Sequence, residues 1–191
     1  MEMSLLLNTP RLVLDCVQER DAEAFWPLVT DARLTEFLAW EPHHEKYETE
    51  AMVGALIEAQ EGRRGFHWAV RMEQILVGLV SLIDVRWTHR SWTLNRAELA
   101  YWIGPDFHGR GLATEAAEAV VRCGFDTLGL RKIIVFHAAD NPSSGRVVHK
   151  LGFRSVGTER EAFCKEGKWH DLQHYEMLRS EFLMQKKDVY E

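Results

Sequence analysis

The chain has 191 residues but only three cysteines, Cys16, Cys123 and Cys164, which lie far apart in the sequence. Their odd number and the absence of a CxxC pair argue against a disulfide framework or a zinc knuckle and favour a reducing compartment. Basic residues are also in the minority: 23 Lys and Arg stand against 29 Asp and Glu, a net charge of −6. This overall field does not favour nonspecific binding to nucleic acid.

Long apolar segments, internal repeats and low-complexity stretches are missing as well. The N-terminal MEMSLLLNTPRL contains a short apolar run. It has no basic flank before the run and no small-residue cleavage site. We therefore expect neither a signal peptide nor a transmembrane span, no membrane partner and a cytoplasmic location. With 46% hydrophobic and 27% charged residues, the chain has enough apolar surface for a core. We expect residues 1–191 to form one domain.

Hydrophobic periodicity predicts strands alternating with helices. The predicted strands are residues 11–17, 66–72, 75–85, 97–104 and 132–139, with two more joined around Glu166-Gly167. The predicted helices begin near Asp21, at Asp31, at Thr49 as N-cap, at Leu112 and at Asn141. Pro27 separates or kinks the first two, and Gly62 and Gly152 end the third and the last. This order places one strand–helix–strand crossover in an otherwise antiparallel pattern. It predicts an α/β fold with a mixed, mostly antiparallel sheet flanked by helices.

The segment GPDFHGRGLATEA, residues 104–116, places Gly109 and Gly111 directly before the predicted Leu112 helix. The first turn of a helix has unpaired N–H groups and a partial positive charge. Glycines allow an anion to approach those groups closely. The pattern therefore favours a phosphate-binding loop, although an ordinary strand-to-helix turn also accounts for the glycines.

Two well-known phosphate loops do not fit this segment. A dinucleotide-binding GxGxxG needs a third glycine where Thr114 stands, and it should follow the first strand of the fold. A P-loop needs GxxxxGK[ST]. The spacing from Gly104 to Gly109 is right, but Arg110-Gly111 follows in place of the lysine and hydroxyl.

The stretch HGRGLA, residues 108–113, resembles the [Q/R]xxGx[G/A] loop of the GNAT superfamily of N-acetyltransferases, with His108 at its first position. NTPRLVL, AELAYWIG, ATEAAEAVVRCGF, NPSSGRVVHKLGF and GKWHDLQHYEML resemble the RimJ/RimL-like branch, the ribosomal-protein N-terminal acetyltransferases, in order along residues 7–178. The resemblance implies the GNAT acyl-CoA N-acyltransferase fold and acetyl-CoA as co-substrate. It implies that the pyrophosphate of coenzyme A is bound by His108, Gly109, Arg110, Gly111, Leu112, Ala113 and Thr114.

The same resemblance assigns further cofactor contacts. Main-chain groups of Tyr101, Trp102 and Ile103 would pair with the pantetheine arm, between two central strands that splay apart. Asn141 would hydrogen-bond pantetheine. Apart from the resemblance, Arg110, Arg146 and Lys150 are positioned to offset the charge of coenzyme A. The alternatives are core packing for the strand side chains, a turn at Asn141-Pro142, and solvated basic side chains.

Acetyl transfer to an amine needs a base for the amine, a donor for the oxyanion and a proton for the leaving thiolate. In the resembling group, the position of Glu98 can act as the base, and partial burial would raise its pKa. The alternative is a structural glutamate paired with Arg96 or Arg71. Ser144 matches a proposed acid of the Rim-like branch; it could instead cap or begin a helix. Val148 occupies the position where many GNAT enzymes have a tyrosine acid.

The nine histidines do not predict a metal site. His170 and His174 lie in a predicted strand, where four residues separate side chains by roughly 13 Å, too far for one zinc. Cys164 has no base beside it that would make it a nucleophile. Four of the seven tryptophans, Trp26, Trp40, Trp87 and Trp92, fall in regions that line the acceptor side in the resembling family. Core packing is the alternative for most of them.

The expected activity is acetyl-CoA-dependent N-acetylation of a primary amine by direct attack in a ternary complex. The acceptor is a protein N-terminus or a small molecule, and residues 40–47 and 87–95 are expected to be substrate loops. We expect no nucleic-acid partner, and a homodimer is left open. A non-catalytic acyl-CoA-binding module is the alternative, since it would keep the loop but not need Glu98. A nucleotide-dependent oxidoreductase is a third hypothesis.

Overall fold

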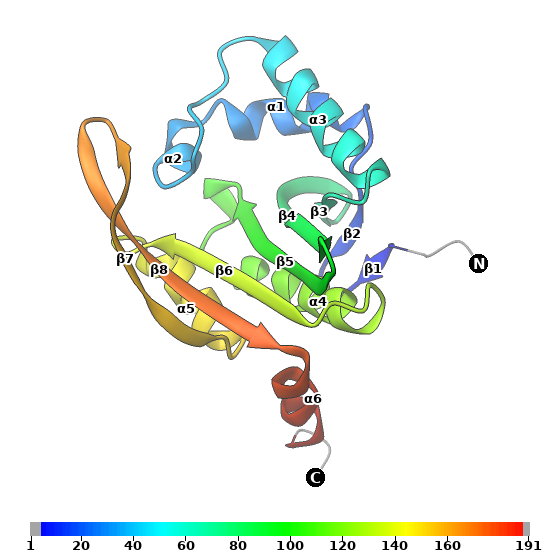
Figure 1. The fold of residues 1–191 in the computed structure, drawn as a ribbon. Helices are drawn as coiled ribbons and strands as arrows, with labels where there is room; N and C mark the ends of the chain where they lie inside the picture. The colour runs from blue at the N-terminus through cyan, green and yellow to red at the C-terminus, as the bar shows by residue number, and fades with distance from the viewer. Residues whose placement is uncertain (1–4, 189–191) are drawn as a thin grey trace.

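The computed structural model describes residues 5–188, and a single eight-stranded sheet organises them (Figure 1). The strands lie in the order β1-β2-β3-β4-β5-β6-β8-β7. Their bounds are β1 Leu7–Asn8, β2 Val13–Cys16, β3 Phe66–Met72, β4 Ile75–His89, β5 Trp92–Ile103, β6 Lys132–Ala138, β7 Arg154–Lys165 and β8 Lys168–Leu178. The helices are α1 Asp21–Val29, α2 Ala32–Thr35, α3 Lys46–Glu61, the 3₁₀ turn η1 Pro105–Phe107, α4 Leu112–Asp126, α5 Pro142–Lys150 and α6 Arg179–Asp188.

Every neighbouring pair of strands is antiparallel except β5 and β6, which are parallel and joined through α4. This arrangement confirms the predicted mixed, mostly antiparallel sheet. The parallel pair is in register only from Arg96↔Lys132 to Glu98↔Ile134. Because β5 continues to Ile103 and β6 to Ala138, the two strands diverge beyond Glu98.

Helices cover both faces of the sheet, and each face has its own hydrophobic core. On one face, Leu112, Ala116 and Val120 of α4 pack on sheet residues that include Leu99 and Ile133. On the other face, the apolar sides of α1 and α3 pack on β3 and β4, with Trp102 of β5 partly buried against them. Neighbouring residues of β5 therefore face opposite cores, as the period of a strand requires. Burying a large apolar side chain contributes about 1.5–3 kcal/mol, so the two cores hold the sheet between the helices.

Several predicted boundaries were wrong. The third long helix begins at Lys46 rather than at Thr49, because Glu45 and Glu48 form a capping box in which the Glu48 carboxylate accepts the Glu45 N–H at 2.8 Å. Thr49 is buried inside that helix. Pro27 lies within α1 and does not separate it from α2. α6 follows the last strand, where no helix was predicted.

Residues 87–95, which were expected to form a loop, are mostly β-strand. β4 runs on to His89 and β5 begins at Trp92, so these residues form the end of a long hairpin arm. Its turn has Arg90 at φ +54° and contains no glycine. The predicted hairpin at Glu73-Gln74 is confirmed, again with positive φ at both non-glycine turn residues. No helix within the described residues is long and apolar enough to cross a membrane.

Candidate active site

The glycine loop ends at the exposed beginning of α4. Gly109 and Gly111 have φ values of +75° and +76°, in the left-handed region that favours glycine. Gly111 is the N-cap, and no side chain among the described residues caps the helix there. The Glu115 N–H donates to the Gly111 carbonyl at 3.1 Å and closes the first turn. The N–H groups before it have no partner within the helix, and a Cβ at Gly109 would meet nothing within 4 Å. This donor set and open approach fit a diphosphate.

The side chains of His108 and Arg110 contact residues that precede the loop. The imidazole of His108 lies with Nε2 2.7 Å from the Ile103 carbonyl. The Arg110 guanidinium lies over the Phe107 ring at 5.6 Å. Leu112 is buried, so only its main chain is available to a ligand. Ala113 and Thr114 are half-buried in the first turn of α4. His108 and Arg110 are exposed, so the main chain and these two side chains of the loop are all accessible.

Thr9 and Arg11 fix the loop from a distant part of the chain. Thr9 Oγ1 donates to Glu115 Oε1 at 2.6 Å, and Arg11 Nε donates to Glu115 Oε2 at 2.7 Å. Arg11 Nη1 also donates to the carbonyl of Arg110 at 2.9 Å. From the sequence, this region was expected to form a strand over residues 11–17 and to carry part of the family resemblance, but Thr9 and Arg11 were not predicted to lie at the site. The polar Thr-x-Arg within that apolar segment was the available signal.

Ser144 and Tyr101 meet where β5 and β6 have separated. The Tyr101 hydroxyl lies 2.7 Å from Ser144 Oγ and can also donate to the Ser144 carbonyl at 3.1 Å. Asn141 is the N-cap of α5, because its Oδ1 accepts the Ser144 N–H at 3.1 Å. Ser144 is therefore a first-turn residue and not the cap. The side chain of Tyr101, predicted to act through its main chain alone, reaches across to α5.

Glu98 faces the side of the sheet opposite to its buried neighbours Ala97 and Leu99, and is itself half-buried. Within residues 5–188 its carboxylate makes no hydrogen bond or ion pair. The expected alternative partner Arg71 is instead bound to Asp15 at 2.9 Å and Asp21 at 2.7 Å. Burial, and secondly the negative charge of Asp84, raise the pKa of Glu98 to about 7. A carboxyl with this pKa is suited to accept a proton near neutral pH.

Asp84 stands at an irregularity of β4 beside Glu98. The pairing of β4 with β5 shifts between Ile83↔Glu98 and Arg86↔Arg96, and Asp84 has φ +47°. Bulges of this kind redirect side chains and are frequent next to active sites. Arg86 Nε donates to Asp84 Oδ1 at 2.9 Å. Asp84 was not among the predicted site residues, although an aspartate within the apolar LVSLIDV was the available signal.

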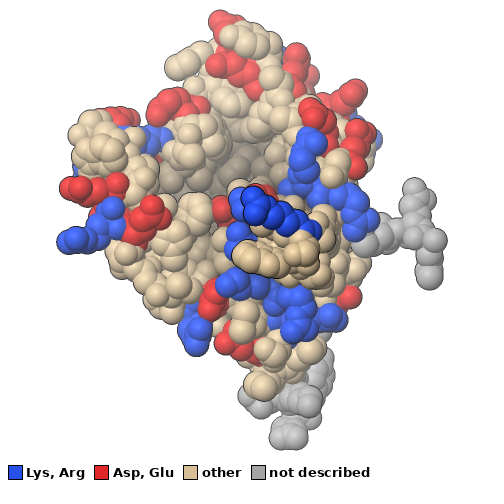
Figure 2. All heavy atoms as spheres, viewed as in Figure 1, with Lys and Arg blue, Asp and Glu red and all other residues tan. Residues whose placement is uncertain are grey.

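The Glu98 side of the sheet borders a hollow. Figure 2 shows it between the α1–α3 helices and the β4–β5 arm, with a mostly uncharged surface. Trp40 packs edge-on against Trp102 with ring centroids 6.5 Å apart, and Trp102 against Phe25 at 5.7 Å. Trp26 is half-buried in α1. Trp87 instead donates to the Arg63 carbonyl, and Trp92 is exposed at the end of the arm.

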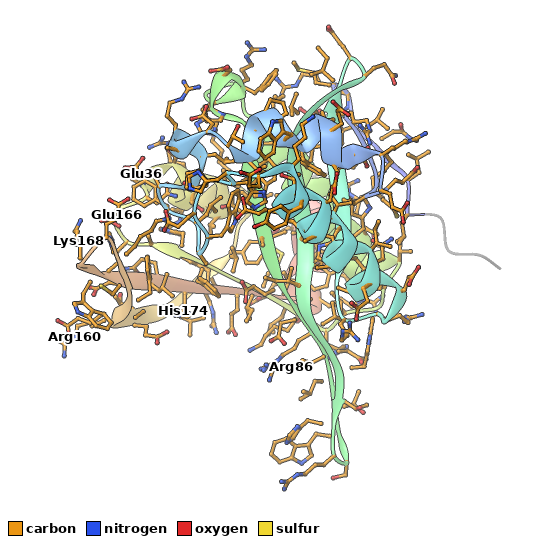
Figure 3. The ribbon with its side chains drawn as sticks, turned by 90° about the horizontal axis from the view of Figure 1, so that it is seen from above. Glu36, Arg86, Arg160, Glu166, Lys168 and His174 are labelled. Carbon is orange, nitrogen blue, oxygen red and sulfur yellow. The ribbon has the colours of Figure 1, made fainter. Side chains whose placement is uncertain are left out.

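The β7–β8 hairpin is tied to the segment that carries Trp40. Lys165 Nζ donates to the carbonyls of Thr35, Leu38 and Trp40 at 2.6, 2.9 and 3.2 Å. Figure 3 shows Glu166 and Lys168 at the outer end of this hairpin, near Glu36, and Arg86 on the β4–β5 arm. Arg146 is exposed on α5 and donates to Ser143 Oγ at 2.9 Å.

Neither metal ligation nor cavity volume marks this site. His170 and His174 lie on β8 and bind separate carboxylates, Asp140 and Glu159. In the described part of the chain, no three His, Cys, Asp or Glu side chains are grouped to hold a metal. Two depressions of about 730 and 560 Å³ lie along the β1–β2 edge and are not lined by Glu98 or Ser144. The site is instead marked by the divergence of β5 from β6 and by the glycine loop, because these bring main-chain donors and the Glu98 carboxylate to one region.

A diverging parallel pair beside a glycine loop at a helix N-terminus defines an α/β protein built to hold an extended, anionic ligand. Residues 11–154 match the family model described as Acetyltransferase (GNAT) domain. The chain belongs to this family, and it is accordingly an N-acetyltransferase.

Curated relatives cover almost the whole chain. The uncharacterized N-acetyltransferase YoaA of Bacillus subtilis is 28% identical over 91% of this chain and 97% of its own length. A spermidine N(1)-acetyltransferase of Vibrio cholerae is 26% identical, over 91% and 96%. The [ribosomal protein uS5]-alanine N-acetyltransferase of Escherichia coli is 27% identical, over 86% of each. This last similarity is consistent with the RimJ/RimL-like branch.

Among solved structures, RimL, a ribosomal L7/L12 alpha-N-protein acetyltransferase in complex with coenzyme A, superposes with a TM-score of 0.84 at 20% identity. The match covers 91% of this chain and 97% of that one. This likeness confirms the GNAT fold predicted from the sequence. It assigns no role to an individual residue here, so Glu98, Ser144 and the cofactor contacts stay predictions.

Proposed function

We propose that this chain transfers the acetyl group of acetyl-CoA to a primary amine. The observation that carries the proposal is the divergence of β5 from β6 beside the open Gly109–Gly111 loop. It leaves main-chain groups of β5 beyond Glu98 unpaired with β6, although His108 contacts the Ile103 carbonyl, and sets them next to free helix N–H groups. An extended thioester with a diphosphate at one end matches both features.

Main-chain N–H groups of residues 109–114 would hold the diphosphate. Main-chain groups of Tyr101, Trp102 and Ile103 would pair with the pantetheine arm as an added strand would. The Ser144 N–H occupies the side-chain oxygen of Asn141. The side-chain NH₂ of Asn141 makes no hydrogen bond within residues 5–188, so it would donate to pantetheine. Arg110 and Arg146 would supply positive charge from exposed positions.

In the proposed reaction, Glu98 takes a proton from the ammonium of the acceptor, directly or through water. The free amine attacks the thioester carbonyl, and a C–N bond forms. A main-chain N–H of β5 donates to the oxygen that becomes negative. The C–S bond then breaks, and the leaving thiolate takes the proton of Ser144 Oγ. The proton that the attacking nitrogen loses on becoming an amide returns through water to Ser144 Oγ. The attack is direct, without an acyl-enzyme; the buried thiol of Cys123, its pKa raised to about 11 by burial, is a poor nucleophile.

The acceptor class follows from chemistry the relatives share. Spermidine and the alanine N-terminus of a ribosomal protein, named for two of them, both present a primary amine. A half-buried carboxylate with a pKa near 7 suits such an amine. We propose a peptide N-terminus or a small primary amine as acceptor, and we predict a cytoplasmic location.

The test compares two glycines with the same backbone conformation. Gly109→Ala adds a methyl group where the diphosphate would approach. Gly129→Ala is the matched control, because Gly129 has φ +72° and open space around it, as Gly109 does. Each variant should lose about 1–2 kcal/mol of stability from the left-handed conformation. Calorimetry should show coenzyme A binding at least tenfold weaker in Gly109→Ala, and unchanged in Gly129→Ala.

Turnover is measured by thiol release from acetyl-CoA across polyamines and short peptides with free N-termini. Equal coenzyme A affinity in both glycine variants would remove the proposed diphosphate site. Tight binding without turnover on every amine would favour the non-catalytic acyl-CoA-binding module instead.

A further inference from the structure

An arginine far from the glycine loop in sequence is built into it in space. Arg11, between β1 and β2, contacts Glu115 of α4 through three groups. Its N–H donates to Oε1 at 2.9 Å, and its Nε and Nη2 lie 2.7 and 2.6 Å from Oε2. Its remaining Nη1 donates to the carbonyl of Arg110. The guanidinium thus connects the first turn of α4 with the peptide between the two left-handed glycines.

We infer that Arg11 is a positioning residue for the acyl-CoA diphosphate, which it serves by fixing the Arg110–Gly111 peptide and by neutralising Glu115. This inference rests on the proposed function. Residues 109–111 contain two left-handed glycines, so the peptide between them has few steric restraints of its own. A hydrogen bond from outside the loop is therefore needed to select one orientation.

The planarity of the peptide bond explains how Arg11 orients a donor. In a trans peptide, C=O and N–H point in opposite directions. The Arg110 carbonyl points toward Arg11, so the Gly111 N–H must point away from it. With that carbonyl held, the N–H stays turned toward the open side of the loop. A carbonyl rotated into the opening would instead present negative charge to a diphosphate.

Arg11 also neutralises the charge of Glu115. Its carboxylate lies in the first turn of α4, where an unpaired negative charge would repel a bound diphosphate. Burial alone would raise the pKa of Glu115, but the hydrogen bonds from Thr9 and Arg11 outweigh it. The net pKa is lowered, so the carboxylate remains ionised at neutral pH. The guanidinium, with Nε and Nη2 both on Oε2, offsets this charge. The Arg11 Nη2 lies 3.7 Å from where a Cβ on Gly111 would stand, so its positive charge is on the loop side.

The test replaces Arg11 by Met, which keeps a long stem and removes every side-chain donor. Arg122→Met is the matched control: Arg122 pairs with Glu118 of the same helix, and its side chain is 54% exposed against 48% for Arg11. Calorimetry with coenzyme A should give about a tenfold weaker Kd for Arg11→Met and no change for Arg122→Met. Arg11→Lys keeps the charge but cannot bridge Glu115 and the Arg110 carbonyl, so its Kd should lie between those of the wild type and Arg11→Met. This variant keeps the test decisive if the methionine variant misfolds.

A second readout separates diphosphate positioning from general damage. S-acetylpantetheine contains the thioester and lacks the diphosphate. In Arg11→Met, kcat/KM should fall about tenfold with acetyl-CoA and stay unchanged with S-acetylpantetheine. Wild-type affinity for coenzyme A in the variant, or equal losses on both thioesters, would overturn the inference and leave the proposed function standing. Failure of the wild type itself to bind coenzyme A would instead overturn the proposed function, and the inference with it.

Discussion

The hydroxyl of Tyr101 lies 2.7 Å from Oγ of Ser144, at the place where β5 and β6 have separated. Tyr101 has one proton to donate, and two oxygens of Ser144 are within reach. If the proton goes to Oγ, the Ser144 proton is free for a third group. If it goes to the main-chain carbonyl, Ser144 donates back to Tyr101. Burial raises the pKa of Tyr101 to about 12, so the phenol keeps its proton at neutral pH.

Ser144→Ala is expected to lower kcat with acetyl-CoA by about 10²-fold, since it removes the proposed donor to the leaving thiolate. Tyr101→Phe should lower kcat only a few-fold, because Tyr101 acts by orienting Ser144. The double variant should therefore match Ser144→Ala, which a double-mutant cycle on kcat measures.

The control for this cycle is Ser143→Ala. Ser143 is adjacent and exposed, and its hydroxyl contacts Arg146 alone in the described structure. Its replacement should leave kcat unchanged. Full activity in Ser144→Ala, or additive losses in the double variant, would contradict the proposed roles.

Glu98→Gln is expected to abolish the acidic limb of the pH–rate profile. The base must be ionised to accept a proton, so kcat/KM of the wild type should rise with pH through about 7, the pKa of Glu98. The amide keeps the shape but accepts no proton, and the rate should fall about 10²–10⁴-fold. Steady-state kinetics from pH 5.5 to 9, at roughly unit intervals, test this. Glu118→Gln, on the exposed face of α4, should retain the limb.

The same carboxyl affects stability with a definite sign. Its pKa is 4.5 in a free side chain and about 7 in the folded chain, so the native state binds more protons between these values. The free energy of unfolding contributed by Glu98 therefore decreases as pH rises through that window. Because Glu98 is only partly buried, solvent screening reduces the effect to about 1 kcal/mol. Glu98→Gln should gain stability over wild type between pH 4.5 and 8 in chemical denaturation. A pH-independent difference would contradict it.

Local features of the site were predictable from the sequence, and long-range ones were not. Asn141 and Ser144 are three residues apart, so one helical turn brings the cap and its partner together. Glu98 was conspicuous as a carboxylate between apolar neighbours. Arg11 and Glu115 are 104 positions apart, and Lys165 and Thr35 are 130 apart. No spacing rule encodes such contacts, because the sheet order determines them.

The boundary errors have similar physical causes. Glu45 is a less favoured N-cap than Thr49, and only the reciprocal contact with Glu48 makes it one. The β4–β5 arm lacks apolar alternation and turns at Arg90 without a glycine, so its pattern is typical of a loop. Main-chain pairing extends the two strands there, together with side-chain contacts such as His89 with Trp92.

Lys165→Met is expected to weaken acceptor binding without weakening cofactor binding. The Lys165 side chain is only 12% exposed, and its ammonium satisfies three carbonyls of the segment that carries Trp40. Losing the shared donor should cost about 1–3 kcal/mol. It should also free Trp40 from its position against Trp102. KM for the amine should rise several-fold, while KM for acetyl-CoA stays the same.

Lys168→Met provides the contrast, because Lys168 stands across the same turn and pairs with Asp140 at 2.9 Å with 69% of its side chain exposed. It should alter neither KM nor the unfolding midpoint by more than a small amount, since exposed pairs contribute little. Equal behaviour of the two lysine variants would mean that the hairpin does not shape the acceptor side. A rise in the KM of Lys165→Met for acetyl-CoA would contradict the prediction. It would mean that the segment at Trp40 supports cofactor binding and not acceptor binding.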